Sequence, residues 1–335
     1  MRIENPATAP HIHYHENTKV VMGDAILPMA AIYAMCFYYY GPRVLLLLVT
    51  SVFSSVAADV LCTLISGKRV NARDYSAIVT GMIIPLMMPA SIPFHIAAIA
   101  AVFGITIVKH PFGGVGNNVF NPAAAGVAFA IVCFPVRMFT YPMPLETLPV
   151  FPDETLLQVS SPAFTLQLGG VPNYDFVDMS LGNFPGPMGA TNILVILACL
   201  LYLVLRGAVR WEMPVAYLAV FAALCWAFPR DNMNAAQNIL YDMMSGTVLF
   251  GGAFMLTDPV TTPQRAWAKA AYAALAGAAV FLFRRYSRYE EEFVFVLLIM
   301  NATVWGFDMV GERIAGIFRR KKFETLDDKK VQKKQ

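Results

Sequence analysis

The sequence predicts an all-α polytopic membrane protein, with about ten transmembrane helices arranged as two inverted five-helix repeats. Its composition is the first reason: of 335 residues, 57% are hydrophobic and 14% are charged, whereas soluble domains carry about 25% charged residues. The second reason is that uncharged apolar runs recur along the chain, many of them near the ~20 residues that cross a bilayer. The third is a constant offset that relates the runs of one half to those of the other.

Ten apolar spans are predicted, five in each half. They lie at 20–40, 44–66, 74–89, 94–109, 120–136, 191–206, 212–228, 241–257, 267–283 and 292–310. Adding 169 to the first five ranges places them nearly on the second five, and Ser76 and Ser245 are themselves 169 residues apart. The third span of each half is short and interrupted by glycine or proline, which often marks the functional centre of a repeat-built membrane protein. Coincidental glycine and proline content, common in membrane helices, also explains these interruptions.

Lys and Arg are unevenly distributed between the two sides of the membrane. With the N-terminus inside, cytoplasmic segments hold 19 of these residues and the other side holds 6. The positive-inside rule therefore places both termini in the cytoplasm, and five spans per half make the second repeat inverted. The predicted parts are a cytoplasmic segment at 1–19, repeats at 20–136 and 191–310, an extracytoplasmic loop at 137–190 and a basic cytoplasmic tail at 311–335. We expect no cleaved signal peptide, because the first residues lack an apolar core.

Composition also limits the partners and metals. A net charge of +3 is too small to indicate nucleic-acid binding. The five cysteines are isolated in apolar segments and form no CxxC pair, so we expect no iron–sulfur or zinc site. His11, His13 and His15 alternate near the N-terminus. Metal binding is one interpretation, but a solvated segment is favoured because no cysteine or carboxylate lies at ligand spacing.

A glycine- and asparagine-rich run lies between the fourth and fifth spans. Gly113 and Gly114 would let the backbone approach a ligand closely. Asn118 and Asn121 can form hydrogen bonds with a planar amide edge, which suits a flavin ring. A tight re-entrant turn explains the glycines equally well.

Two further polar residues are candidates for function. Thr191 follows Gly189 and Ala190 at the start of the sixth span, where small neighbours should leave its hydroxyl accessible and a helix start favours a phosphate. On spacing alone, an N-cap role is the favoured interpretation. Asp59 lies within the second span, where a carboxylate is costly and indicates ion or proton handling. Hydrogen bonding between helices would serve as well.

These motifs together resemble the NqrB/RnfD family of membrane flavoproteins, which comprises the D subunit of Rnf complexes and the B subunit of sodium-pumping NADH:quinone oxidoreductases. The resemblance covers residues 9–310. The motifs that carry it are Ala9-Pro10-His11-Ile12, Asp74-Tyr75-Ser76-Ala77 with Thr80-Gly81, the FGGxGxNxFNPA run at 112–123, Gly189-Ala190-Thr191, and Gly252-Ala253-Phe254-Met255 with Thr257-Asp258-Pro259. The length and the short N-terminus favour the Rnf member.

The resemblance implies a function and its cofactors. The Rnf complex passes electrons between ferredoxin and NAD and couples this to Na⁺ or H⁺ transport. FMN would be joined to Thr191 through a phosphoester by a separate flavin transferase, and a second, non-covalent flavin (riboflavin) is also implied. The chain would relay electrons with no catalytic residue of its own, next to the A, B, C, E and G subunits, in a prokaryotic inner membrane. The alternatives are an NqrB-like subunit, a urea-transporter-like solute channel built from the same kind of repeat, and a passive scaffold.

Overall fold

The computed structural model describes residues 18–68, 74–114, 116–146, 148–150, 159–287 and 289–332, and within these it is almost entirely helical. His11, His13 and His15 lie outside the described residues. One isolated β-bridge joins Tyr141 and Val159. The first bundle comprises α1 (Thr18–Tyr40), α2 (Arg43–Ile65), α3 (Ser76–Leu86), α4 (Phe94–Phe103) with its π-helical continuation η1 (Gly104–Lys109), α5 (Pro122–Cys133) and α6 (Pro135–Met138).

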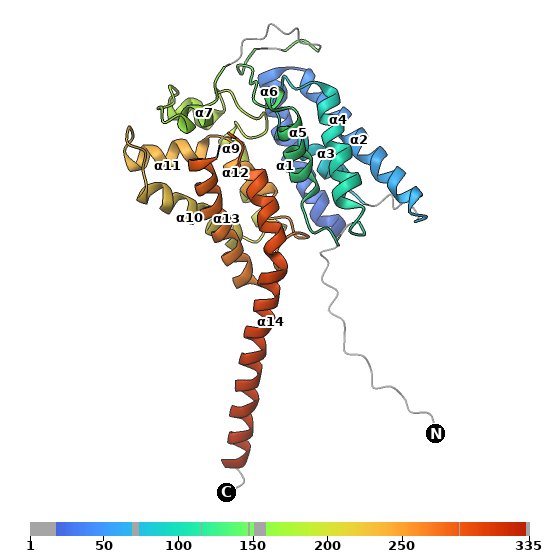
Figure 1. Cartoon of the computed structure of the whole chain (residues 1–335), viewed down its shortest axis with the longest axis vertical. Helices are drawn as coiled ribbons and strands as arrows, with labels where there is room; N and C mark the ends of the chain where they lie inside the picture. Colours follow the sequence, from blue (N-terminus) through green and yellow to red (C-terminus); the bar gives the residue numbers. More distant parts are fainter. Residues whose placement is uncertain are drawn as a thin grey trace.

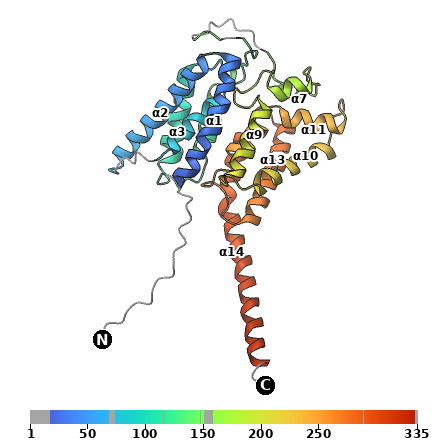
Figure 2. The same cartoon turned by 180° about the vertical axis from the view of Figure 1, so that it is seen from behind.

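A second bundle lies beside the first (Figure 1). It comprises α9 (Ile193–Leu205), α10 (Glu212–Ala227), α11 (Ala235–Met244), α12 (Val248–Phe254), α13 (Ala266–Tyr286) and α14 (Phe293–Gln332). The connection between the bundles carries two short helices, α7 (Pro162–Gln167) and α8 (Phe176–Leu181). Figure 2, seen from behind, shows that α14 continues well past the rest of its bundle.

The helices have the length and the surface of a multi-pass membrane protein. Four segments are long and apolar enough to span a bilayer: Met22–Tyr40, Arg43–Ile65, Ala266–Tyr286 and Phe293–Gly311. Shorter apolar helices accompany them: Ser76–Leu86, Phe94–Lys109, Pro122–Cys133, Ile193–Leu205 and Glu212–Ala227. Large apolar side chains such as Phe53 and Trp305 are about three-quarters exposed, as expected for a surface that faces lipid rather than water.

The predicted span at 241–257 is not one continuous helix. The structure divides it into α11 and α12, at the glycine-containing interruption that the sequence indicates. Ser245 has an extended backbone (φ −100°, ψ 152°) and Gly246 is left-handed (φ +62°), a conformation that glycine adopts without steric cost. The predicted edge at 310 is not a structural boundary either, since α14 continues without a break to Gln332.

Helices α1 and α9 join the two bundles and run antiparallel. Near one end, Arg206 donates a hydrogen bond to Asp24 at 2.8 Å. Near the other end, the Cys36 thiol donates to the Met188 carbonyl at 3.0 Å. The start of α1 therefore lies beside the end of α9.

Glycines bring helices within each bundle into close contact. A Cβ on Gly126 of α5 would lie 2.4 Å from the Ala100 carbonyl oxygen of α4, and one on Gly277 of α13 would lie 2.4 Å from the Tyr217 carbonyl oxygen of α10. Backbones can approach this closely only where the side chain is absent, as is common in membrane helix packing.

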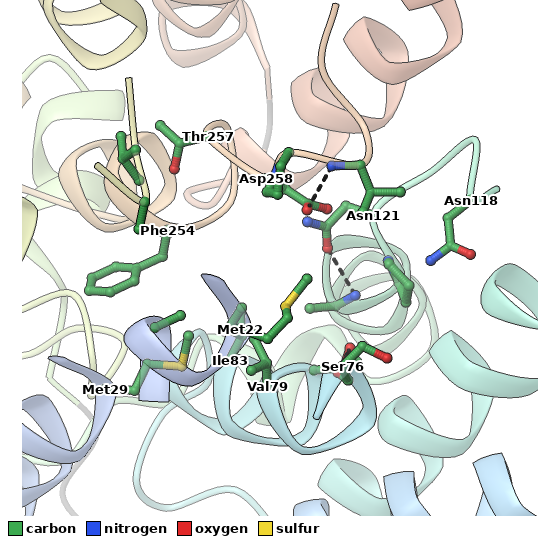
Figure 3. A pocket seen from close by; sticks show the side chains of 18 of the residues that line it. Met22, Met29, Ser76, Val79, Ile83, Asn118, Asn121, Phe254, Thr257 and Asp258 are labelled. Carbon is green, nitrogen blue, oxygen red and sulfur yellow. Dashed lines mark hydrogen bonds between the residues drawn. The ribbon is translucent and has the colours of Figure 1, made fainter. Parts of the chain in front are cut away.

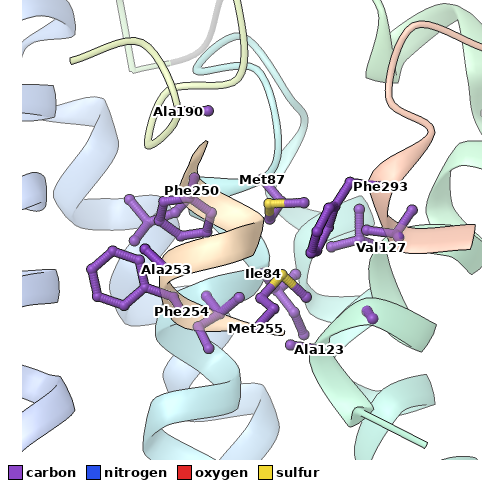
Figure 4. Close-up of a cluster of buried hydrophobic side chains, with 14 of the residues drawn as sticks. Ile84, Met87, Ala123, Val127, Ala190, Phe250, Ala253, Phe254, Met255 and Phe293 are labelled. Carbon is purple, nitrogen blue, oxygen red and sulfur yellow. The ribbon is translucent and has the colours of Figure 1, made fainter. Parts of the chain in front are cut away.

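Apolar side chains fill the space between the bundles (Figure 4). Ile84 and Met87 come from α3 and its end, and Phe250 and Met255 come from α12 and its end; all four are buried. Phe293 at the start of α14 packs over Gly251, where a Cβ would lie 2.3 Å from the ring. This core holds the two broken third spans, α3 and α12, face to face.

Candidate functional site

The turn that carries Thr191 is held against the end of α3. The Met188 amide donates to the Met88 carbonyl at 3.0 Å, and the Gly189 amide donates to the Leu86 carbonyl at 2.8 Å. Gly189 is required there, because a Cβ would lie 2.5 Å from the Leu86 Cβ. The small residues before Thr191 therefore serve close packing between the two bundles.

Two expectations for Thr191 were wrong. Its side chain is 1% exposed, so its small neighbours do not make the hydroxyl accessible. It is also not the N-cap of α9: Asn192 has that role, with its side-chain oxygen accepting from the Val195 amide at 3.0 Å. The Thr191 hydroxyl donates only to the Met188 carbonyl, at 3.5 Å, which is at the long limit for a hydrogen bond. The structure thus leaves this hydroxyl buried and weakly bonded.

Asn121 and Asn118 differ in their bonding. Asn121 caps α5, its side-chain oxygen accepting from the amides of Ala123 at 3.0 Å and Ala124 at 3.1 Å. Its own amide donates to the Asn301 side-chain oxygen of α14 at 3.0 Å. Asn118, in contrast, has a buried side-chain oxygen without a hydrogen-bond partner. A buried polar atom left without a partner is costly, so this oxygen is available to a ligand.

Both asparagines line a cavity of about 790 Å³, including its open mouth, between the two bundles. Most of its wall is apolar, from residues such as Met22, Val79 and Phe254. Asn121 and Asp258 lie side by side on another part of the wall (Figure 3). An apolar pocket with a few polar groups is the usual form of a small-molecule site.

The cavity and Thr191 are two separate places. Leu203, near the end of α9, lines the cavity, whereas Thr191 precedes the first residue of α9. A helix rises ~1.5 Å per residue, so Leu203, 12 positions after Thr191, lies about 18 Å along the helix axis from it. Gly113 and Gly114 do not line the cavity; both are left-handed, with φ of 109° and 96°, in the turn after η1.

Asp59 belongs to an ion-pair network within the first bundle, which links α2, the end of η1 and the residues before α3. Its carboxylate lies 2.8 Å from Lys109 Nζ and 2.9 Å from His110 Nε2. Lys109, which is 2% exposed, also lies 3.4 Å from Asp74. Of the two interpretations left open by the sequence, bonding between helices is the one seen in these contacts.

The sequence reasoning missed a second buried network. Arg230, Asp242, Arg284, Glu291 and Glu292 are each less than one-tenth exposed. Arg284 Nε lies 3.1 Å from Asp242 Oδ1, and Arg284 Nη1 lies 3.3 Å from Glu292 Oε1. The sequence did carry a signal for this network, because charged residues stand at the ends of apolar spans. Charged residues in such places usually pair with one another.

The fold defines a class: a multi-pass helical membrane protein with a largely apolar cavity between its two bundles. The model of the NQR2, RnfD, RnfE family matches residues 5–316. The chain belongs to this family.

Its relatives include subunits of ion-translocating complexes. It is 31% identical to the D subunit of the Na⁺-translocating ferredoxin:NAD⁺ oxidoreductase complex of Acetobacterium woodii, covering 94% of this chain and 96% of that one. It is 27% identical to the D subunit of the proton-translocating ferredoxin:NAD⁺ oxidoreductase complex of Clostridium ljungdahlii, covering 88% and 91%. It is 28% identical to the D subunit of the ion-translocating oxidoreductase complex of Escherichia fergusonii, covering 89% and 94%.

Proposed function

We propose that this chain is the electron-carrying D subunit of an ion-translocating ferredoxin:NAD⁺ oxidoreductase of the Rnf type. Relatives that are the D subunits of such complexes, and that match about nine-tenths of the chain, carry this proposal. The chain would act in a prokaryotic inner membrane next to the A, B, C, E and G subunits. A flavin accepts and releases single electrons, while the protein binds it and sets its potential.

We propose that FMN is attached to Thr191 through a phosphoester formed by a flavin transferase. The hydroxyl stands in the sequence Gly189-Ala190-Thr191 and has only the long bond to Met188. Because Thr191 is buried, attachment requires the 186–191 turn to move away from α3.

We also propose that a second flavin, riboflavin, binds at the cavity between the bundles. Asn118 offers an unpartnered side-chain oxygen to the polar edge of the ring, and the apolar wall suits its face. A flavin there would lie on the opposite side from Thr191, about one α9 length away.

The packing supports two inverted five-helix repeats. Helix α2 packs on α3 and α4 as α10 packs on α12 and α13, and α4 packs on α5 as α13 packs on α14. Across the bundles α1 contacts α9, and α5 contacts α14. The antiparallel pairing of α1 with α9 is the one that an inversion requires. With both termini in the cytoplasm, 137–190 is the outer loop and 311–335 the inner tail. α11 has no counterpart among the described helices of the first bundle.

An ion path past Asp59 stays part of the proposal. The relatives differ in the ion they are named for, Na⁺ in one and protons in another. An ion on this path would have to compete with Lys109 and His110 for the Asp59 carboxylate.

Flavin fluorescence on a denaturing gel tests the attachment site. The chain is produced with a flavin transferase, and Thr191→Ala should lose the fluorescent band and the added FMN mass. Thr262→Ala is the matched control, since this threonine is also buried and its hydroxyl has no partner. A band that persists in Thr191→Ala would show the site to be wrong, and no band in the wild-type chain would refute covalent FMN altogether.

The solute-channel alternative is less well supported. Side chains including Ile84, Phe250 and Phe293 fill the centre between the bundles. Solute flux through proteoliposomes that contain the purified chain would revive this alternative.

A further inference from the structure

The second buried network contains more carboxylates than cations. Asp242 contacts both Arg230 and Arg284, and Glu292 contacts Arg284. Two carboxylates thus balance two guanidinium groups. Glu290 and Glu291 are left over, because no Lys, Arg or His nitrogen of the described residues lies within 4.0 Å of either one.

Hydroxyl and amide groups, rather than cations, contact these two glutamates. Glu291 accepts from the Thr247 amide at 3.1 Å and from the Thr247 hydroxyl at 2.5 Å. Glu290 accepts from the Ser161 hydroxyl. Such donors only partly offset the cost of burying a second and third charge in one place.

A buried hydroxyl without a partner lies near these glutamates. Tyr141 is 1% exposed, and its hydroxyl has no hydrogen-bond partner among the described residues. Burial is the largest cause that raises the pKa of Tyr141, and the nearby charges of Glu291, Glu290 and Glu292 raise it further. Tyr141 also pairs through its backbone with Val159, whose chain neighbour Ser160 lines the same hollow as Glu290. A buried hydroxyl left without a partner is costly, so this one is available to a bound species.

A route to the solution exists on the same side. Glu290 lines a surface hollow with residues that include Thr140, Ser160 and Phe164. Tyr141 and Val159, the bridge pair, are the chain neighbours of Thr140 and Ser160. Glu290 is half-buried at the hollow, and Glu291 lies fully buried beside it.

We propose that Glu290 and Glu291, with the Tyr141 hydroxyl, form a proton-binding site at the Thr191 end of the molecule, open to the solution through this hollow. Protons are the species of choice because the described residues contain no group of three His, Cys, Asp or Glu able to hold a metal ion. A proton also removes the buried charge without needing a full set of oxygen ligands. The site is independent of the flavins, and nothing in it requires Thr191 to be modified.

Burial supports the same assignment. It raises the pKa of Glu291 to about 8 and that of Glu290 to about 7, with the neighbouring Glu292 adding to both shifts. Both residues precede α14, outside the membrane-spanning segment Phe293–Gly311. The two protons would therefore exchange near neutral pH.

Infrared difference spectroscopy tests the proposal on the full-length protein in detergent. The pH is stepped through the range in which the two glutamates titrate. We expect a protonated-carboxyl signal at neutral pH that is lost as the pH rises. Glu291→Gln should remove its higher-pH component, while Glu146→Gln, an exposed glutamate of the loop that precedes α7, should leave it intact. Thr191→Ala should also leave it intact, so that a failure of the flavin proposal is distinguishable.

Three results would overturn the proposal. One is a signal that survives Glu291→Gln, and another is a wild-type protein without any protonated carboxyl at neutral pH. The third is a signal that sodium chloride removes at constant pH when potassium chloride does not, since the site would then bind a metal cation. If Glu291→Gln does not fold, Tyr141→Phe keeps the buried ring and loses only the hydroxyl. The signal should then shift in frequency and in its pH midpoint, and an unchanged signal would contradict the role of Tyr141.

Discussion

Replacing Gly189 by alanine tests whether the Thr191 turn is fixed by close packing against α3. The added Cβ would lie 2.5 Å from Leu86 Cβ and 2.9 Å from both the Leu86 carbonyl oxygen and Leu86 Cδ2. Leu86 is fully buried. The turn must therefore move away from α3, and its bonds to Leu86 and Met88 lengthen or break.

The expected loss follows from these contacts. Overpacking a filled core costs roughly 1–3 kcal/mol, and each of the two backbone hydrogen bonds contributes about 0.5–1.5 kcal/mol net. Alanine restricts the unfolded chain, which returns about 0.4–1 kcal/mol. With partial relaxation, we expect Gly189→Ala to lower the free energy of unfolding by about 2–3 kcal/mol.

Thermal unfolding in detergent, followed by the loss of monodisperse protein, measures the effect. Gly306→Ala is the matched control, because no atom lies within 4 Å of its Cβ position in α14 and alanine favours a helix by up to about 1 kcal/mol. The reasoning is refuted if Gly189→Ala and Gly306→Ala unfold at the same temperature as the wild type.

Three other perturbations have defined outcomes. Lys109→Met should lower the free energy of unfolding by about 2–4 kcal/mol, because it removes the buried cation that pairs with the Asp59 carboxylate. The double variant Lys109→Met, Asp59→Asn should recover part of this loss, as measured by thermal unfolding. Asn118→Leu should keep the stability and lose acid-extractable flavin, because its side-chain oxygen has no protein partner, whereas Asn121→Ala should lose about 1 kcal/mol as a helix cap. Glu291 has a folded-state pKa of about 8, raised from 4.5, so the folded protein binds this proton more tightly than the unfolded chain. Its contribution to stability is complete below about pH 4.5 and is lost as the pH rises to about 8. The unfolding temperature of the wild type should therefore fall over this pH range, and that dependence on pH should be weaker in Glu291→Gln.

Hydropathy was sufficient for most of the helices but not for their contacts. Whether a segment is apolar enough to form a membrane helix depends on its own residues. Helices α1, α2 and α13 therefore lie close to their predicted ranges. The turn that carries Thr191 packs through Gly189 against Leu86, which is 103 positions earlier in the chain. A local sequence pattern cannot reveal a contact over such a separation. Asp59 and Lys109 are likewise 50 positions apart. A single sequence shows that such charges need partners, but it does not show which ones they find.

The two buried networks occupy corresponding places in the two bundles, and their charge balance decides how they behave. Asp74 precedes α3 and Asp242 precedes α12, 168 positions later. Each pairs with a cation near the end of the fourth helix of its bundle, Lys109 or Arg284. At the first network, Lys109 contacts both Asp59 and Asp74, and His110 Nε2 lies 2.9 Å from Asp59, within hydrogen-bonding distance.

At the second network the described residues supply no such cation for Glu290 or Glu291. Arg230 and Arg284 are already balanced by Asp242 and Glu292, and the donors on Glu291 come from Thr247, which is neutral. A proton taken from the solution would remove the charge that these described residues leave on the two glutamates. The asymmetry favours proton exchange at the end of the molecule where α14 begins. Ser161→Lys adds one cation beside Glu290, so it should remove the Glu290 component of the protonated-carboxyl signal and leave the Glu291 component.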